Sequence, residues 1–573
     1  MTGDIDRVRI GNASGFYGDR FSAVREMLTG GELDYLTGDY LAELTMLILG
    51  RDRLKDPEAG YAKTFLRQMQ ECLGLAVERG VKIVTNAGGL NPAGLAARLT
   101  DLAASLDVDV AISYIDGDNL IERADEFGFD NPVSANAYLG AFGIKAALDA
   151  GADVVVTGRV TDASLTVGPA ASYFGWGPED LDALAGAVVA GHIIECGAQA
   201  TGGNYAFFTE LDMSRPLGFP IAEVAADGSS VITKHADTGG GVTVGTVTAQ
   251  LLYEITGPRY LNPDVTARMD SVHLVQDGTD RVAVSGVRGE APPRNLKVSL
   301  NRLAGFRNEM DLILTGLDIE AKAQLVAGQL QSALENPPAE LTFTLARIDH
   351  PDADTEEAAS AVLRCVARDT DPTRVGRELS SAVVGLALAS YPGFAATTPP
   401  TAASPYGIYE AGYVDAEAVT HRVNHSDGSV EEIPPSPMRT DVLPPLPAHD
   451  SSAGPVEFGP TVSAPLGRIA GARSGDKGGG ANVGVWVRSA QEFAWLDAYL
   501  DTALLRKLLP EAADLEIHRH RLPNLYALNF VIDGLLGRGV ADNVRFDPQA
   551  KGLGEWLRSR VVEIPQSFVD DLR

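Results

Sequence analysis

"VKIVTNAGGLNPAGLAARLTDLAASL", residues 81–106, holds one complete structural repeat of this chain. It begins with a short apolar run that suits a buried strand, followed by the polar, glycine-containing turn "NAGGLNP". Apolar residues then recur at helical spacing, and Pro92 suits the first turn of that helix. A strand, a tight turn and a helix in this order are typical of a βα unit in a parallel sheet.

Four more runs repeat the pattern on either side of this stretch. They are "RVRIGNASG" (7–15), "LDYLTGDYL" (33–41), "VDVAISYIDGD" (108–118) and "ADVVVTGRVTD" (152–162), and each ends in a polar loop that contains glycine. Because helical patterns separate the strands, the sequence predicts an α/β fold with a mainly parallel sheet over residues 1–205.

The rest of the chain divides into segments that differ in composition and in hydrophobic pattern. Residues 206–422 mix helical and strand patterns, which predicts a second, α+β region packed on the first sheet. Residues 423–464 contain eight prolines and many polar residues, as expected of a linker. Residues 465–573 read as strands and helices in the order of a small ferredoxin-like α+β domain.

Composition limits the classes of partner. Asp and Glu number 77 against 47 Lys and Arg, a formal charge of −30. Such a surface repels phosphate backbones and anionic lipid, so we expect neither nucleic acid nor membrane as a partner. Three scattered cysteines imply no disulfide framework, and no secretion signal or 18-residue apolar run is present. We therefore expect a cytoplasmic protein. We also expect a homo-oligomer.

Polar residues that follow the predicted strands are the candidate site, because ligands of open parallel sheets bind at the carboxyl ends of the strands. These residues are Asn12, Ser14, Asp39, Asn86, Gly88, Gly89, Asp116, Asp118, Arg159 and Asp162.

Acid–base chemistry is the use that this set suggests. Asp116 or Asp162 would act as the general acid or base, with Arg159 orienting a carboxylate or carbonyl. Asn86 and the amides of Gly88 and Gly89 would stabilise an oxyanion. Two plainer interpretations stay open: tight turns that require glycine, and carboxylates that cap helices.

Metal binding by the same carboxylate oxygens is another alternative. No zinc-ligand spacing is present, and His192 with Cys196, four residues apart on a helix, does not make a site. We therefore expect no metal and no other cofactor.

Two further glycine-rich segments are candidate anion-binding sites. "DTGGGVTVG" (237–245) precedes a helix but lacks the dinucleotide spacing, so the amides of Gly239, Gly240 and Gly241 would bind a carboxylate or a CoA phosphate. "SGDKGGG" (474–480) fails the Walker A pattern because its lysine precedes the glycines. It would present Ser474, Asp476 and Lys477 on a mobile loop near an anionic ligand, or be a glycine turn entering an edge strand.

Taken together, the motifs resemble a known family. "GNASGFYGDR", "NAGGLNP", "VVVTGRVTDASLTVGPA", "HIIECGAQATGGNY", "HADTGGGVTVGTVTAQLLYEI" and "SGDKGGGANVGV" occur in this order. The chain is similar over its whole length to the acyclic terpene utilisation family, AtuA-type, with a fused C-terminal ferredoxin-fold domain that is sometimes encoded separately. The resemblance implies bacterial breakdown of terpenes such as citronellol and geraniol, through branched acyl-CoA thioesters and a biotin-dependent acyl-CoA carboxylase. It implies no catalytic residues.

Two functions follow as expectations. The first is an enzyme that acts on an acyl-CoA or a carboxylic acid by hydratase, isomerase or lyase chemistry, with the CoA thioester as substrate. The second is a non-catalytic binding or scaffolding subunit, associated with an acyl-CoA carboxylase or another pathway enzyme. In the first, Ser474, Asp476 and Lys477 would close over the sheet edge near Asn86 and Asp116.

Overall fold

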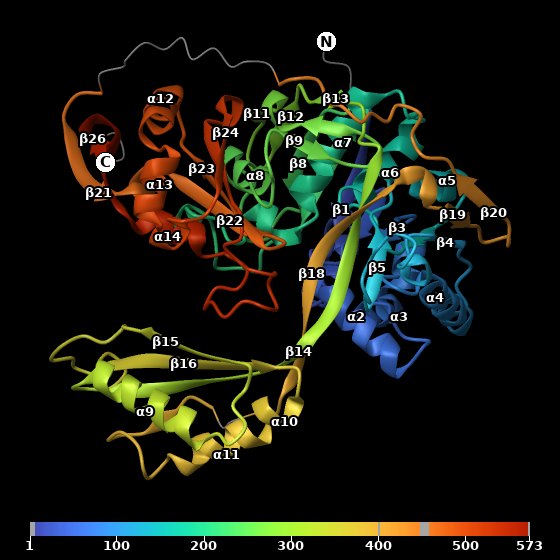
Figure 1. Ribbon diagram of the computed structural model, residues 1–573. Coiled ribbons are helices and arrows are strands. Elements are labelled where there is room, and N and C mark those ends of the chain that lie inside the picture. The colour runs from blue at the N-terminus through green and yellow to red at the C-terminus, as the bar shows by residue number, and fades with distance from the viewer. Residues whose placement is uncertain (1–5, 399–400, 447–457, 571–573) are drawn as a thin grey trace. The chain divides into compact units, whose positions relative to one another are not determined.

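An eleven-stranded sheet organises the N-terminal part of the structure, a computed structural model that describes residues 6–398, 401–446 and 458–570 (Figure 1). Its strands, in spatial order, are β11 (His273–Gln276), β12 (Val282–Ser285), β8 (Ser230–Lys234), β7 (Pro220–Ala225), β1 (Arg7–Asn12), β2 (Tyr35–Gly38), β3 (Lys82–Thr85), β6 (Val154–Thr157), β4 (Ile112–Asp116), β19 (His421–Asn424) and β20 (Val430–Ile433).

Only the centre of this sheet is parallel. The five strands predicted from the N-terminal repeats lie together in the order β1-β2-β3-β6-β4, and each pairs in parallel with its neighbour. Every pairing outside them is antiparallel. The sheet is therefore mixed, which corrects the expectation of a mainly parallel sheet: later segments, joined by hairpins that need no crossover helix, extend both edges.

Helices cover both faces of the parallel centre. On one face pack α1 (Ala23–Gly30), α3 (Lys63–Glu78) and α4 (Pro92–Leu106); on the other pack α5 (Phe142–Asp149), α6 (Ser164–Phe174) and α7 (Leu181–Ile194). Two separate apolar clusters lie between the sheet and these layers. Strands β2, β3 and β6 are consequently buried on both sides, whereas Arg7 and Arg9 of β1 are partly exposed.

Helix α7 is the most deeply buried of these helices. All residues from Leu184 to Ile194 are buried, because the helix lies between the large sheet and a small one formed by β13 (Arg288–Glu290), β10 (Thr266–Arg268) and β9 (Arg259–Leu261). Its apolar composition, "LDALAGAVVAGHII", suits this position. The helix ends at Ile194, so Glu195 immediately follows its last buried turn.

The C-terminal domain is an antiparallel sheet covered by helices. The sheet order is β22 (Gly471–Lys477), β23 (Gly480–Trp486), β25 (Ala527–Ile532) and β24 (Ile517–Leu522). Helices α12 (Ala490–Tyr499), α13 (Thr502–Leu508) and α14 (Leu553–Ser559) enclose its own apolar cluster, and β21 (Thr461–Pro465) pairs with β26 (Val561–Pro565). Trp486 stacks on Tyr205 and shares the cluster of α7, so this domain packs on the N-terminal core.

A second compact unit comprises residues 302–408 with 541–548; the residues described above belong to the first. Its sheet contains β15 (Glu340–Ala346), β16 (Ser360–Asp369), β17 (Ala395–Ala396) and the distal parts of the long strands β14 (Asn295–Thr315) and β18 (Ser404–Asp415). Helices α9 (Ile319–Ala333), α10 (Pro372–Val375) and α11 (Arg377–Gly385) enclose its core. Residues 541–548 join it through Arg307, which donates to the carbonyls of Ala541 and Asn543.

The predicted segments 206–422 and 423–464 are divided differently in the structure. Strands β7, β8, β11 and β12 of the first segment extend the core sheet, and only residues 302–408 form a separate unit. The predicted linker begins inside the core sheet, where β19 and β20 form a hairpin. Residues 447–457 of that linker lie outside the described residues.

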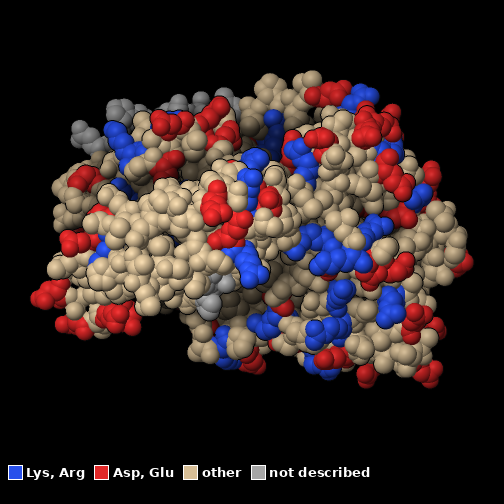
Figure 2. All heavy atoms as spheres, turned by 60° about the horizontal axis from the view of Figure 1, so that its bottom comes forward, with Lys and Arg blue, Asp and Glu red and all other residues tan. Residues whose placement is uncertain are grey.

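Charged side chains are unevenly distributed on the face drawn in Figure 2. Asp and Glu lie mainly around its margin and near its centre, Lys and Arg gather mostly in the right-hand half, and a broad area at the left has few of either. Among the helices that the structure describes, none has both the length and the apolar character needed to cross a membrane.

Close packing of α7 on the β7–β8 turn makes a direct test of this fold. A Cβ atom added at Gly186 would lie 2.2 Å from the backbone oxygen of Gly228. We expect Gly186→Ala to lower the free energy of unfolding by about 1–3 kcal/mol, because backbone rather than a flexible side chain must move. Denaturant unfolding of the purified full-length chain measures this.

The matched control is Gly74→Ala in α3, where the nearest atom, Val108 Cγ2, is 3.7 Å from the added Cβ. Relief of the glycine entropy cost should raise stability there by about 0.5–1 kcal/mol. Equal effects of the two substitutions would contradict the packing described for α7.

Candidate active site

Three adjacent parallel strands bring the candidate residues together. Asp39 follows β2, Asn86 follows β3, and Arg159 and Asp162 follow β6, the next strand in the sheet. Asn86 donates from Nδ2 to Asp39 Oδ1 over 2.6 Å, and Asn86 Oδ1 accepts the N–H of Tyr40 at 2.7 Å. The sheet edge therefore fixes a buried amide–carboxyl pair beside an arginine.

Arg159 is the central cation of this edge. Its side chain is only 3% exposed, donates from Nη2 to Asp162 Oδ1 over 2.5 Å and from Nη1 to the carbonyl of Leu41, and stacks over the ring of Tyr138. Among the described residues its buried Nε has no hydrogen-bond partner. A guanidinium held in this way, with its Nε–H unpaired, is suited to orienting a bound anion or carbonyl.

The end of α7 adds a second carboxyl group that the strand-end argument missed. Glu195 Oε1 lies 3.2 Å from His192 Nδ1, and the Glu195 side chain is 9% exposed. Its Oε2 is buried and, within the part of the chain described, makes no hydrogen bond. The sequence signal that could have identified Glu195 was an acidic residue, in "HIIECG", directly after a largely apolar helix.

Burial favours the protonated forms of these carboxyl groups. Desolvation first, and then the negative charge of Asp162, raise the pKa of Asp39 well above its usual value, with Arg159 opposing them. Desolvation, Asp162 and Glu254 raise the pKa of Glu195 likewise, against Lys477 and Arg159. Desolvation, and next the charge of Lys477, lower the pKa of His192 to about 4, so its ring is neutral at pH 7.

Lys477 reaches this site from the C-terminal domain. It ends β22 opposite Gly480 of β23, so Ser474, Asp476 and Lys477 stand on a paired strand, and the expected mobile loop is reduced to the turn Gly478–Gly479. Arg473 anchors the strand, because its guanidinium lies 4.1 Å above the ring of Tyr253 and hydrogen-bonds Gln199.

Ser474 serves the C-terminal domain itself. Its hydroxyl donates to the carbonyl of Lys551 and accepts the N–H of Gly554. Asp476 pairs with Ala481 of β23 along the hairpin. Of the three residues expected near the ligand, Lys477 acts electrostatically on Glu195 and His192.

Asp116 does not join the cluster, contrary to expectation. β4 lies beyond β6 at the margin of the parallel strands and pairs with β19, so the Asp116 carboxylate accepts from Arg422 Nε at 2.8 Å and from Asn424. Asp118, two residues on, is buried, and its Oδ2 accepts the N–H of Arg159 and the side-chain amide of Asn136. It positions the loop that carries Arg159.

Other predicted ligand groups are used inside the fold. Asn12 donates from Nδ2 to the carbonyls of Ile194 and Glu195, so it fixes the end of α7 and does not face a ligand. Ser14 donates to the carbonyl of Phe16. The Gly89 amide donates to the Asn86 carbonyl, and an added Cβ at Gly88 would lie 2.5 Å from the Thr157 oxygen, so these glycines permit a tight turn.

The predicted anion site at "DTGGGVTVG" (237–245) is wrong for a similar reason. The amides of Gly239, Gly240 and Gly241 donate to the carbonyls of Pro216, Asp212 and Thr201, respectively. Because all three donors are occupied by backbone, none is free for a carboxylate or phosphate. Asp280 Oδ1 takes the next amide, that of Val242.

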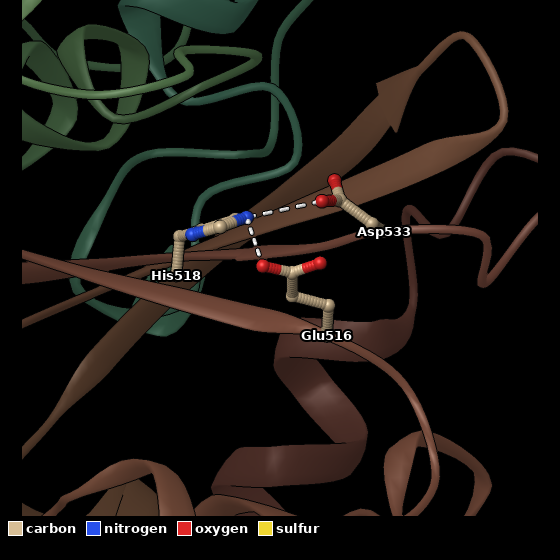
Figure 3. A group of neighbouring side chains, drawn as sticks. All are labelled: Glu516, His518 and Asp533. Carbon is tan, nitrogen blue, oxygen red and sulfur yellow. Dashed lines mark hydrogen bonds and ion pairs between the residues drawn. The ribbon is translucent and has the colours of Figure 1, made fainter.

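One group of side chains has the spacing of metal ligands. Among the described residues, Glu516, His518 and Asp533 are the group of three whose ligand atoms lie within 4.8 Å of one another (Figure 3). His518 Nε2 is 3.1 Å from Asp533 Oδ2 and 3.5 Å from Glu516 Oε1, and all three side chains are exposed. Surface ion pairs account for this geometry, and we assign no metal to it.

A small cavity lies elsewhere in the same unit. It has a volume of about 40 Å³, the size of a few water molecules, and Asp264 and His421 line it among mostly apolar residues. Asp264 accepts the N–H of Ala141 at the start of α5, and burial raises its pKa to about 6. This carboxyl group therefore has a structural role at the helix end.

Comparison with known proteins gives two matches. Residues 8–425 match the model of the acyclic terpene utilisation family protein AtuA, and residues 464–563 match the AtuA ferredoxin-like domain. The second match confirms the ferredoxin-like C-terminal domain. Searches of curated proteins and of solved structures found no significant match.

Burial of Asp118 predicts a specific pH dependence. Desolvation raises its pKa from the usual 3.8 to about 6, so its contribution to stability is complete below pH 4 and is lost as pH rises through 6. Such a rise corresponds to roughly 3 kcal/mol. We expect the unfolding free energy of Asp118→Asn, relative to the parent, to increase by up to that amount between pH 4 and pH 7, as measured by urea unfolding.

Asp497→Asn is the control with the opposite sign. Although desolvation opposes it, hydrogen bonds from Arg521 and Arg519 lower the pKa of Asp497, so its stabilising contribution is present above pH 4 and lost in acid. A pH-independent difference between Asp118→Asn and the parent contradicts the assignment of a buried, readily protonated Asp118.

Proposed function

Because the chain belongs to the acyclic terpene utilisation family AtuA, we propose that it is a catabolic enzyme acting on an acyl-CoA or carboxylate by acid–base chemistry of the hydratase, isomerase or lyase type. One observation carries the proposal. A single buried site combines carboxyl groups whose pKa is raised, Asp39 and Glu195, with a carboxylate that is ion-paired to Arg159. Two carboxyl groups in unlike environments divide naturally into acid and base.

Glu195 is the proposed proton donor. Its raised pKa keeps a proton available, and its buried Oε2, without a hydrogen-bond partner among the described residues, is free to meet a substrate. Asp162 is the proposed base, because its side chain is 28% exposed, reachable by substrate, and fixed by Arg159. Asn86 acts through Asp39, which its amide positions.

The substrate would be bound by its carbonyl or carboxylate end. Arg159 has one Nε donor without a partner in the described chain, and Lys477 adds a positive charge next to Glu195. These cations stand out in a protein whose formal charge is −30, and they favour an anionic or carbonyl oxygen. These residues suit proton removal from the carbon next to such a carbonyl, or proton addition to a double bond.

The decisive comparison is between two aspartates. Asp162→Asn should reduce turnover, or growth of a complemented deletion strain on an acyclic terpene, by at least ~100-fold in rate, because general bases contribute about 10²–10⁴. Asp116→Asn is the matched control, since it removes the charge of a strand-end aspartate that pairs with Arg422 and lies outside the cluster. Protein abundance is measured in both strains.

Growth of Asp162→Asn as fast as that of Asp116→Asn and of the parent, at equal protein abundance, would reject the proposed enzymatic role. It would favour the other expected function, a scaffolding subunit for an acyl-CoA carboxylase, which needs surfaces and no proton transfer.

Ligand class is tested by thermal shift with branched-chain carboxylic acids, their CoA thioesters and free CoA. A ligand present at 100 times its dissociation constant adds about 2.7 kcal/mol of stability. We expect acids or thioesters to stabilise the parent protein. They should bind at least ~10-fold more weakly to Arg159→Lys, because lysine keeps the charge and loses the fixed Nε donor. Stabilisation by free CoA alone, unchanged in Arg159→Lys, would contradict binding at this edge.

A further inference from the structure

Glu254 has an unusual backbone for its residue type. It follows the C-terminal end of α8 (Val244–Leu251) with φ = 55°, in the left-handed region where helices normally place glycine or asparagine. Of the ten described non-glycine residues with positive φ, seven are Asp or Asn, and the others are Glu254, Tyr526 and Ala550. A glutamate is disfavoured there and persists only where its surroundings impose the conformation.

The C-terminal domain imposes it. Asn482 of β23 accepts the N–H of Glu254 at Oδ1 over 2.9 Å and donates from Nδ2 to the carbonyl of Leu252 over 2.7 Å. Asn529 of β25 donates to the carbonyl of Ile255 at 3.1 Å, and its Oδ1 accepts a second bond from Asn482. Both asparagine side chains are completely buried, so the end of α8 is hydrogen-bonded directly into the C-terminal sheet.

Two glycines of the hairpin allow this close approach. A Cβ atom added at Gly484 would lie 2.5 Å from Leu252 Cβ, and one added at Gly475 would lie 2.5 Å from the ring of Tyr253 and 3.0 Å from Glu254 Cγ. Side chains at either position would push the hairpin away from α8. Gly475 and Gly484, the first and last glycines of "SGDKGGGANVG", thus serve contact between the domains.

Glu254 also belongs electrostatically to the cluster. Its charge acts on Glu195 and His192, and Tyr253 makes a side-chain hydrogen bond to it. The cluster already contains a buried oxygen, Glu195 Oε2, without a partner among the described residues, which points to a ligand independently of Glu254.

We propose that the C-terminal domain completes the site by holding Glu254 in a left-handed conformation through Asn482, which makes Glu254 a further functional carboxylate and Asn482 its positioning residue. The inference rests on the proposed function for the role of Glu254. The positioning by Asn482 stands on geometry alone. The substrate would meet Glu195 from the core with Lys477 and Glu254 beside it, so neither part of the chain has the complete set without the other.

Unfolding of the full-length chain tests the positioning without any substrate. Glu254→Gly removes the backbone constraint and should leave the unfolding midpoint equal to or above that of the parent. Asn482→Ala should lower the midpoint in both backgrounds, because its bonds to the backbone of Leu252 and of residue 254 are lost in each. The decrease should be smaller in the Glu254→Gly background, since glycine adopts the left-handed conformation without strain.

Asn529→Ala is the control cycle, because Asn529 is equally buried and bonds the same segment but not Glu254. It should lower the midpoint by the same amount with or without Glu254→Gly. A decrease by Asn482→Ala that is also the same in both backgrounds overturns the positioning role.

Glu254→Gln tests the functional role, because it keeps size and backbone while removing the charge. We expect a midpoint close to that of the parent and at least ~10-fold slower growth or turnover. The stable Glu254→Gly variant should show the same loss, which a purely structural role for Glu254 does not predict. Growth like the parent in Glu254→Gln, with loss in Asp162→Asn, overturns the role of Glu254 and leaves the proposed function standing. Growth like the parent in both variants overturns the proposed function itself.

Discussion

The ion pair between Arg159 and Asp162 is the interaction on which the site depends. Arg159 is almost entirely buried, and an isolated buried charge is costly unless it is paired and hydrogen-bonded. Asp162, the Leu41 carbonyl and the ring of Tyr138 meet that requirement from three different loops. Once the guanidinium is fixed, Asp39 and Glu195 can be buried near it, because its charge offsets part of the cost that burial imposes on their ionised forms.

Parallel strand order explains which of the predicted site residues lie together. Asp39, Asn86, Arg159 and Asp162 follow strands that are neighbours in space, so the strand-end argument placed them correctly at one edge. The sequence could not reveal that β6 lies between β3 and β4, and this order is what removes Asp116 from the cluster and pairs it with Arg422. Adjacency along the chain and adjacency in the sheet differ because each crossover helix is long enough to skip a strand.

Residues contributed by helix ends were not predictable by the same reasoning. Glu195 and Glu254 follow α7 and α8, and their positions depend on tertiary packing: Asn12 fixes the first end and Asn482 the second. The glycine segments were misleading for a related reason, since the donors of Gly239, Gly240 and Gly241 are consumed by backbone carbonyls that lie far from them in sequence or beyond a turn. Glycine content indicates close approach of the backbone, and only tertiary structure shows whether the neighbour is a ligand or the chain itself.

The C-terminal domain contributes to the site in two ways that require it to be docked. It supplies the charge of Lys477, which opposes the rise in the pKa of Glu195 while lowering that of His192. It also excludes water from the end of α8, where Asn482 and Asn529 replace the solvent that Leu252, Glu254 and Ile255 would otherwise bind. The close fit between "SGDKGGGANVG" and the end of α8 therefore holds Lys477 and Glu254 in a fixed relation to each other, and it gives a physical reason for joining the two domains in one chain.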